Sequence, residues 1–551
     1  MFDLRELGLR NLQLVRIGMA MLRLVKTRPY DLDVLARLSV AVCVCMLSAS
    51  AIAQTPAPVA NIQLPTGGQV NAGQATISQS GNTLNVNQTS QRAVVDWNTF
   101  NVGKDATVNF QQPNAQSATL NRVTDTQPSQ ILGRITAPGS VVLVNPQGVY
   151  FGKSSSVDVG GLVATTHDAV NQEFMDGQLK LNRNGATGKV ENEGDLRAAL
   201  GGYIAMLAPE VRNTGVIVAN LGTVALAAGE TFELKFEGSG ALSSVRVTAA
   251  AINTLVENKS AIKAPGGLII LSAQAASRLQ TGVINNSGTI EATSLVSRAG
   301  RIVLEASSGI MNSGTISAAN PYADSGNITG VAANLGRISI QANTFTQTST
   351  GLLDVSAIAA QAGSIDIVTV QAMSVSGRIF ANGVVTDPAH IVANALGGTI
   401  HLQATRRVDL TTAVLDASGA GGGGRIHIQA DGDSSPIDNP SEPIHGAVLL
   451  STNSVLRANS ARAQAGRVDL EADDITLDTG TRIEAQGAIQ GGTVWIGGGW
   501  QGSGTLRHAT TVRMSADSVI DASATDNGDG GEVVLWSDVT NANSILSLIH
   551  I

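Results

Sequence analysis

The sequence predicts an all-β protein built as a right-handed parallel β-helix, with small antiparallel elements outside the helix near its N-terminus. Three observations favour this fold. A pattern of glycine followed by alternating aliphatic residues recurs along most of the 551 residues. Charged residues make up 14% of the chain and aromatic residues 3%, which is unusual for a large globular core. No long window after Ala53 shows helical periodicity.

The repeat reads glycine, any residue, aliphatic, any residue, aliphatic. Period-two alternation places one set of side chains inside a β-solenoid and the other set outside, and glycine allows the corner. One repeat alone buries too little apolar surface to offset the entropy of ordering it, so the repeats must stack. The copies begin at Gly139, Gly202, Gly222, Gly267, Gly300, Gly336, Gly363, Gly398, Gly424, Gly466, Gly492 and Gly531.

The N-terminal segment has the features of a signal peptide. A basic region precedes an apolar run at residues 38–53, which ends in the small-x-small signature of Ala51 and Ala53. We therefore predict an extended signal peptide over residues 1–53 with cleavage after Ala53. Cleavage removes Cys43 and Cys45, so the mature chain would form no disulfide.

The stretch at residues 139–166 organises the first half of the chain. Two short predicted strands flank Asn145-Pro146-Gln147-Gly148, which has the composition of a type I turn. A second pair of strands is predicted on either side of a turn at Gly160-Gly161. Upstream, Trp97 and Phe100 are expected to cap the first rung, because an open end would recruit other chains.

Two segments break the repeat pattern, and the first of them is expected to leave the stack. The polar segment at residues 171–185 interrupts the alternation and is interpreted as an excursion. The apolar end at residues 539–551 breaks the repeat pattern and makes a poor terminal cap, which suggests a piece of a longer protein.

No motif predicts catalysis, a metal or a cofactor. Gly497-x-Gly499-x-x-Gly502 fits a dinucleotide fingerprint by letter, but strand-like sequence follows it where a helix is needed, so we interpret it as a corner. His401 and His427 occupy outward positions of separate repeats and are interpreted as solvated surface residues. With a net charge of −8 and no basic stripe, nucleic acid is excluded as a partner.

One enzymatic alternative stays open. Acidic residues gather near Asp431, Asp473 and Asp526, and a β-helical polysaccharide lyase would hold calcium with Asp residues on consecutive rungs. These residues also lie in predicted turns, where Asp is favoured by its backbone interactions. A non-adhesive matrix protein is a further alternative.

Several motifs in the first half carry a family resemblance. Gln112-Pro113-Asn114, Leu120-Asn121-Arg122-Val123 and Asn145-Pro146-Gln147-Gly148 occur in this order, followed by the run at residues 157–166. Together they resemble the two-partner secretion domain that opens exoproteins of the filamentous haemagglutinin family. The resemblance is close over about residues 61–180. It departs at Gln147 and Val149, where the family commonly has Asn and Ile.

The resemblance implies a secretion domain at residues 54–265 and a β-helical repeat region at residues 266–551. It also implies export by the general secretory machinery, and then through an outer-membrane β-barrel transporter whose periplasmic domains recognise the secretion domain. The protein would be secreted or held on the surface of a Gram-negative bacterium as an adhesin, with a host-cell or carbohydrate receptor. Transporter recognition is assigned by the resemblance to Asn114, Asn121, Asn145, Pro146, Gln147 and Gly148.

Overall fold

The structure is a computed structural model that describes residues 59–548, except 239, 278, 295–297, 322–334, 386–394 and 433–444. The predicted signal peptide, with Ala51 and Ala53, lies outside the described residues. Within the described part of the chain, no helix reaches the length and apolarity that a membrane span requires.

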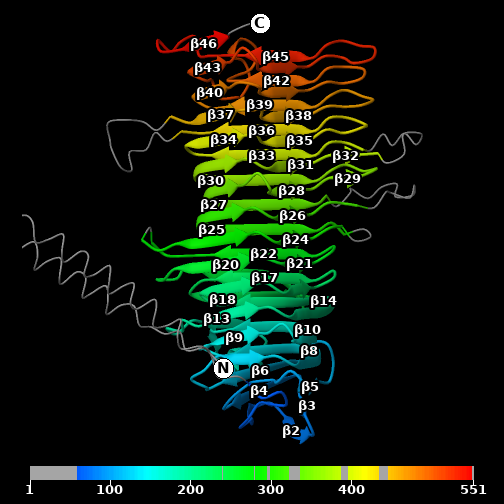
Figure 1. Ribbon diagram of the computed structural model, residues 1–551, viewed down its shortest axis with the longest axis vertical. Coiled ribbons are helices and arrows are strands. Elements are labelled where there is room, and N and C mark those ends of the chain that lie inside the picture. The colour runs from blue at the N-terminus through cyan, green and yellow to red at the C-terminus, as the bar shows by residue number, and fades with distance from the viewer. Residues whose placement is uncertain are drawn as a thin grey trace, which may run out of the picture. The chain divides into compact units, whose positions relative to one another are not determined.

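The described chain winds into a parallel β-helix whose strands stack rung upon rung (Figure 1), as predicted. Each full rung contributes strands to three sheet faces, which we name faces A, B and C. Face A contains the glycine-led repeats. Its strands are β4 (Arg92–Trp97), β6 (Ala118–Val123), β8 (Arg134–Val144), β10 (Ser156–Thr165), β14 (Asp195–Leu207), β17 (Thr223–Ala228), β22 (Leu268–Ala273), β25 (Arg301–Asn312), β27 (Arg337–Gln347), β30 (Ser364–Val375), β33 (Thr399–Ala404), β36 (Arg425–Ala430), β39 (Arg467–Glu471), β42 (Thr493–Ile496) and β45 (Glu532–Leu535).

Faces B and C follow in each rung, and the ends of β25, β27 and β30 continue into face B. Face B otherwise contains β7 (Ser129–Ile131), β9 (Gly148–Phe151), β13 (Lys189–Asn192), β15 (Glu210–Asn213), β20 (Thr254–Asn258), β23 (Gly282–Asn286), β34 (Arg407–Thr411), β37 (Ala447–Ser451), β40 (Asp474–Leu477), β43 (Thr511–Met514) and β46 (Ile545–Leu548). Face C contains the first parts of β8, β10 and β14, with β3 (Thr83–Gln88), β5 (Thr107–Gln111), β16 (Val216–Val218), β21 (Ala261–Lys263), β24 (Thr289–Glu291), β26 (Thr315–Ser317), β28 (Leu352–Asp354), β31 (Arg378–Phe380), β35 (Val414–Asp416), β38 (Val455–Arg457), β41 (Arg482–Glu484) and β44 (Val519–Asp521).

One strand prediction was wrong. The pair of strands expected around Gly160-Gly161 is one strand, β10, which passes from face C to face A across a register shift at these glycines. Near the C-terminal end of the described chain, β46 pairs in parallel with β43 and extends face B.

The core is a column of aliphatic side chains on face A, in register from rung to rung. Ile338, Ile365 and Ile400 pair directly, and Ile426 and Val468 continue the column. All five are fully buried. The inward positions of the repeat are therefore as predicted.

Close packing explains the glycine that opens each repeat. A Cβ on Gly398 would overlap the carbonyl oxygen of Gly363 on the preceding rung, and a Cβ on Gly424 would overlap that of Gly398. Gly466 and Gly492 continue the same relationship. The corner requires glycine because neighbouring backbones approach too closely for any side chain.

A buried asparagine ladder fills one corner of face B. In each pair, the Nδ2 atom of one Asn donates to the Oδ1 atom of the Asn on the next rung, at 2.8 to 2.9 Å. In the same column, the apolar Phe151 precedes the ladder, the buried Gln347 follows its last Asn, and Val375 follows Gln347. The ladder consists of Asn192, Asn213, Asn258, Asn286 and Asn312.

Antiparallel elements lie near the N-terminus, as predicted. β1 (Gln69–Ala72) pairs with β4, and β2 (Ala75–Ser80) pairs with β3. Trp97 and Phe100 meet edge to face at 5.4 Å in the adjoining core, and both are buried.

The predicted excursion at residues 171–185 contains α3 (Asn171–Met175) and β12 (Leu179–Asn182). β12 joins a separate antiparallel sheet with β11 (Asp168–Ala169), β18 (Thr231–Glu237) and β19 (Ala241–Thr248). This sheet covers the outward side of face A and encloses a second hydrophobic core, which includes Val142 and Val163 from face A and Leu181 and Phe232 from the sheet.

Short elements complete the description: β29 (Ala357–Ile358) pairs with β32 (Gly383–Val384), and η2 spans Trp500–Gly502. η2 lies inside the glycine motif that resembles a dinucleotide fingerprint. The motif follows β42, and one 3₁₀ turn takes the place of the helix that a phosphate site needs. The interpretation as a glycine-rich corner is confirmed.

Candidate functional site

Asn145 is the centre of the turn that the sequence singles out. The Gly148 amide donates to the Asn145 carbonyl at 2.9 Å, which closes the predicted turn, and the Gln147 amide donates to Asn145 Oδ1 at 2.9 Å. Asn145 Nδ2 donates to the Gln127 carbonyl and to Ser129 Oγ, both at 3.0 Å. The side chain is fully buried and uses both its donor and its acceptor atoms.

Asn121 on β6 is also fully buried. Its Oδ1 atom accepts a hydrogen bond from Trp97 Nε1 at 3.1 Å. Its Nδ2 atom donates to the carbonyls of Thr119 and Val142, at 3.2 and 3.3 Å. Asn121 therefore connects β6 to both of its neighbours, to β4 through Trp97 and to β8 through the Val142 carbonyl.

Asn114 shapes the turn that leads into β6. Its Oδ1 atom accepts from the Gln116 amide at 3.0 Å and from Ser117 Oγ at 3.4 Å. The turn closes through the Ser117 amide, which donates to the Asn114 carbonyl at 3.1 Å. Asn114 thus has a local role and is only half-buried.

The remaining motif residues differ in exposure. Gln147 is exposed and Pro146 is half-buried. Gly148 is buried at φ +126°, and a Cβ there would come 2.7 Å from the Lys189 carbonyl oxygen. Asn121 and Asn145 belong to neighbouring rungs, because Asn121 pairs with Leu143. The structure shows no hydrogen bond between the side chains of Asn114, Asn121 and Asn145 within its described residues.

Arg122, next to Asn121, connects the β-helix to the antiparallel sheet. Its guanidinium contacts Asp96 on β4 at 3.1 Å and Asp168 on β11 at 2.8 Å. It also donates to the Ala169 carbonyl at 2.8 Å and to Asn171 Oδ1 at 2.9 Å. In the sequence, Arg122 stands out only as part of a motif. Its connecting role was not predicted because its partners are up to 49 residues away.

His401 and His427 correct another sequence interpretation, because they are not separate solvated residues. They lie on successive strands of face A, and their rings stack at 5.2 Å with an interplanar angle of 21°. His401 Nδ1 lies 2.8 Å from Asp366 Oδ1, and His427 Nε2 lies 2.6 Å from Glu471 Oε1.

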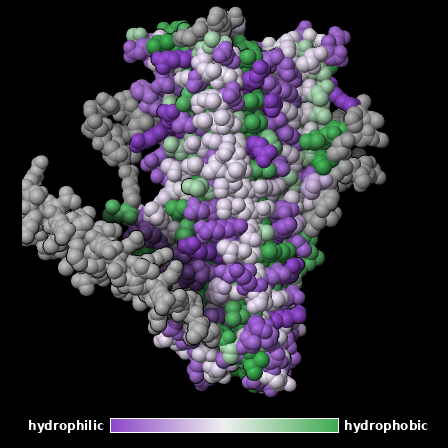
Figure 2. Space-filling view, in the orientation of Figure 1, coloured by the Kyte–Doolittle hydropathy of each residue, from purple (hydrophilic) through white to green (hydrophobic). Residues whose placement is uncertain are grey.

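Charged side chains that bind one another continue along the outward side of face A beyond His401 and His427. Burial alone would raise the pKa of Glu471, but hydrogen bonds from His427 and from the Arg507 amide outweigh it and hold that pKa below its usual value. Asp469, fully buried, binds both Arg425 and Arg467 at 2.7 to 2.8 Å. These outward side chains form an ion-paired ladder along face A. Figure 2 shows, for one side of the molecule, that hydrophilic residues are interspersed with apolar ones along the stack.

The three acidic gatherings do not meet at one place. Asp431 and Asp473 follow successive strands of face A, whereas Asp526 lies in the loop after β44 on face C. Asp431 accepts from Gln403 at 2.7 Å, and Asp473 accepts from the Gly446 amide at 2.8 Å. Across the described ranges, no group of three His, Cys, Asp or Glu residues is arranged to hold a metal ion. This arrangement does not favour the calcium-holding lyase.

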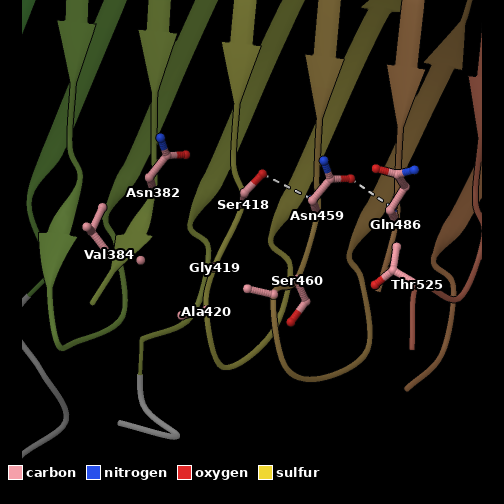
Figure 3. Close-up of a pocket in the computed structure, with 11 residues that line it drawn as sticks. Asn382, Val384, Ser418, Gly419, Ala420, Asn459, Ser460, Gln486 and Thr525 are labelled. Carbon is pink, nitrogen blue, oxygen red and sulfur yellow. Dashed lines mark hydrogen bonds between the residues drawn. The ribbon is translucent and has the colours of Figure 1, made fainter. Parts of the chain in front are cut away.

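A hollow of about 450 Å³ runs along the loops after face C (Figure 3). Its polar side chains link successive rungs. The Asn459 amide donates to Ser418 Oγ at 3.1 Å, and the Gln486 amide donates to Asn459 Oδ1 at 2.7 Å. Small residues such as Gly419 and Ala420 line the rest. Two acceptors that line this hollow, Ser418 Oγ and Asn459 Oδ1, are thus already used by the fold.

Comparisons with known proteins find a matching family and similar proteins for about half of the chain. The family model for the TPS (two-partner) secretion domain matches residues 62–318. A heme/hemopexin-binding protein of Haemophilus influenzae strain Rd is 33% identical over 250 residues, which cover 44% of this chain and 27% of that protein. Another heme/hemopexin-binding protein of Haemophilus influenzae is 30% identical over 299 residues, 50% of this chain and 31% of that protein.

The chain thus spans less than a third of the length of these relatives. Among solved structures, the HMW1 secretion domain from Haemophilus influenzae is similar, with 20% identity and a TM-score of 0.44; the match covers 85% of this chain and all of that one. The family match and the two relatives agree with the motifs around Asn121 and Asn145. The match to the TPS secretion domain therefore extends over residues 62–318, the part of the chain that carries these motifs.

Proposed function

We propose that this chain is a two-partner secretion exoprotein, and that its partner transporter binds the segment from Asn114 to Gly148 in the periplasm before that segment folds. The supporting observation is the complete burial of the Asn121 and Asn145 side chains, whose polar atoms are all used by hydrogen bonds within the protein. A partner can reach these side chains only in the unfolded chain. Extended segments of this kind bind by adding a strand to a sheet edge.

Folding outside the cell then favours export over return. Each rung is stabilised mainly by the rung before it, so the chain adds order progressively as it emerges. The turn at Asn145 closes early in this sequence because its hydrogen bonds are local. The same residues thus serve recognition before folding and the fold afterwards.

For the exported protein we propose a ligand-binding role at the cell surface, of the adhesin type. The outward side chains of the later rungs are charged and polar, which suits a solvated binding surface. The two relatives carry names that describe heme/hemopexin binding, which supports a host protein as the receptor class. A carbohydrate receptor is the alternative.

An export assay tests this function. The chain is expressed with and without its partner transporter, and the secreted fraction is measured. We expect release to require the transporter and to fall at least tenfold for Asn145→Ala. Asn286→Ala is the matched control, because Asn286 is an equally buried asparagine of the ladder. Release without the transporter, or an equal loss for both variants, would contradict the proposal.

A further inference from the structure

A second cavity, of about 280 Å³, lies between face A and the antiparallel sheet. From face A it is lined by Ser140, Val142 and Tyr203, and from the covering elements by Phe174 and Phe236. Tyr203 is buried, and its ring meets that of Phe236 at 5.3 Å with a tilt of 55°. The cavity therefore has an aromatic wall at the edge of the second hydrophobic core.

One charged residue, Arg92 on β4, lines this cavity. No hydrogen bond or ion pair of its side chain is found among the described residues, although Arg122 and Arg183 in the same region each bind carboxylates. No Asp or Glu appears among the described lining residues. A half-buried cation without a counter-charge favours an anion.

The backbone leaves room for this guanidinium. Gly177 lies so close to Arg92 that a Cβ there would come 2.9 Å from Nη2. Burial raises the pKa of Tyr203 to about 12, so its phenol stays neutral at ordinary pH, although Ser140 and Arg92 act in the opposite direction. The cavity thus carries one positive charge beside a neutral hydroxyl.

We propose that this cavity is a binding site for a carboxylate on a compact apolar body, with Arg92 binding the carboxylate and Tyr203, Phe174 and Phe236 enclosing the apolar part. Arginine suits a carboxylate because its planar fork makes two parallel hydrogen bonds. The cavity volume limits the ligand to about the size of one aromatic side chain. Such chemistry occurs in a free aromatic acid and in the C-terminal residue of a peptide.

Calorimetry on the purified secreted protein tests the site with phenylacetate as the probe. Phenylacetamide keeps the apolar body without the charge, and acetate keeps the charge without the body. We expect phenylacetate to bind at least tenfold more tightly than either, and its affinity to fall as salt increases. Equal binding of phenylacetamide, or no binding of phenylacetate at millimolar concentration, would overturn the proposal.

Variants separate the site from the fold. Arg92→Ala should lose at least tenfold in phenylacetate affinity, Arg92→Lys should recover part of it, and Phe236→Ala should weaken all aromatic probes. Arg246→Ala is the control, because Arg246 is an exposed residue of the same antiparallel sheet. Unchanged affinity in a folded Arg92→Ala protein would contradict the site.

Two further probes identify the source of the carboxylate. The tripeptide Gly-Gly-Phe is compared with its C-terminal amide and with phenylacetate. Tighter binding of the free-acid peptide than of phenylacetate would support the site and assign a chain terminus as its ligand. Tighter binding of phenylacetate would support it and assign a free acid. The site would be contradicted if the peptide and its amide bound with equal affinity and Arg92→Ala changed the affinity of neither.

Discussion

Trp97 Nε1 donates a hydrogen bond to Asn121 Oδ1 at 3.1 Å, and both side chains are buried in the first layers of the β-helix. The bond joins β4 to β6, which are parallel neighbours on face A. Two residues that the sequence assigns to different roles, a cap and a secretion motif, are therefore parts of one contact.

Asn121→Ala should lower the free energy of unfolding by about 1–3 kcal/mol, because it leaves the buried Trp97 Nε1 atom without an acceptor. Urea unfolding followed by circular dichroism measures the change. Asn87→Ala is the control, since Asn87 is exposed and should cost less than about 0.5 kcal/mol. Equal stability of the two variants would show that the bond does not hold the first layers together.

The glycine column predicts a steric penalty at each corner. Gly398→Ala should destabilise the protein by about 1–3 kcal/mol, because the new Cβ overlaps the Gly363 carbonyl oxygen and the rungs must separate. Gly530→Ala, with no heavy atom near its Cβ position, is the matched substitution and should be nearly neutral. Thermal unfolding compares the two, and a neutral Gly398→Ala would contradict the packing argument.

The asparagine ladder predicts that replacing one of its members lowers the free energy of unfolding by more than the contribution of a single hydrogen bond. Asn258→Ala removes the acceptor of Asn213 Nδ2 and the donor to Asn286 Oδ1, both at 2.8 Å. Two buried amide groups lose a partner, so the expected loss is about 2–4 kcal/mol. Asn285→Ala, beside the ladder with its side chain on the other side of the strand, should change little. Hydrogen exchange of the flanking rungs would show whether the loss stays local.

His167 predicts a pH dependence. Burial lowers its pKa from 6.5 to about 4, although the Gly229 carbonyl bound to Nε2 at 3.1 Å acts in the opposite direction. The unfolded chain therefore takes up a proton at higher pH than the folded chain. The contribution of His167 to the free energy of unfolding is largest above about pH 6.5. It falls by about 3 kcal/mol in total as the pH decreases to about 4.

Unfolding free energies measured between pH 7 and pH 4 check this. His167→Gln should flatten the part of the decline that belongs to His167, while the carboxylates still contribute theirs. An unchanged slope in the variant would mean that His167 is protonated as easily in the folded protein as in the unfolded one.

Alternation and glycine spacing were enough to predict the stacking of face A, because each repeat adds one rung in a fixed register. Residues such as Ile365 and Ile400 need only their local pattern to be placed inward. The stacked pair of His401 and His427 was overlooked, although each lies three positions after the glycine of consecutive repeats, Gly398 and Gly424. The covering sheet left a signal that was overlooked: in the early repeats the outward residues, such as Val142 and Val163, are apolar as well.

The motif around Asn145 was predicted as a turn from its residues, and its local hydrogen bonds confirm that reading. Its contacts to Gln127 and Ser129 depend on the rung below and could not be read from the turn itself. Arg92 and Tyr203 are 111 positions apart, so no local pattern marks the cavity that they share.

Binding of the partner transporter's periplasmic domains to folded and to unfolded exoprotein is the most direct test of the central claim. Surface plasmon resonance can compare the folded chain with the same chain freshly diluted from urea. With Asn121 and Asn145 buried in the fold, the unfolded chain should bind at least tenfold more tightly, and Asn145→Ala should reduce that binding. Equal affinity for the folded chain would contradict recognition before folding.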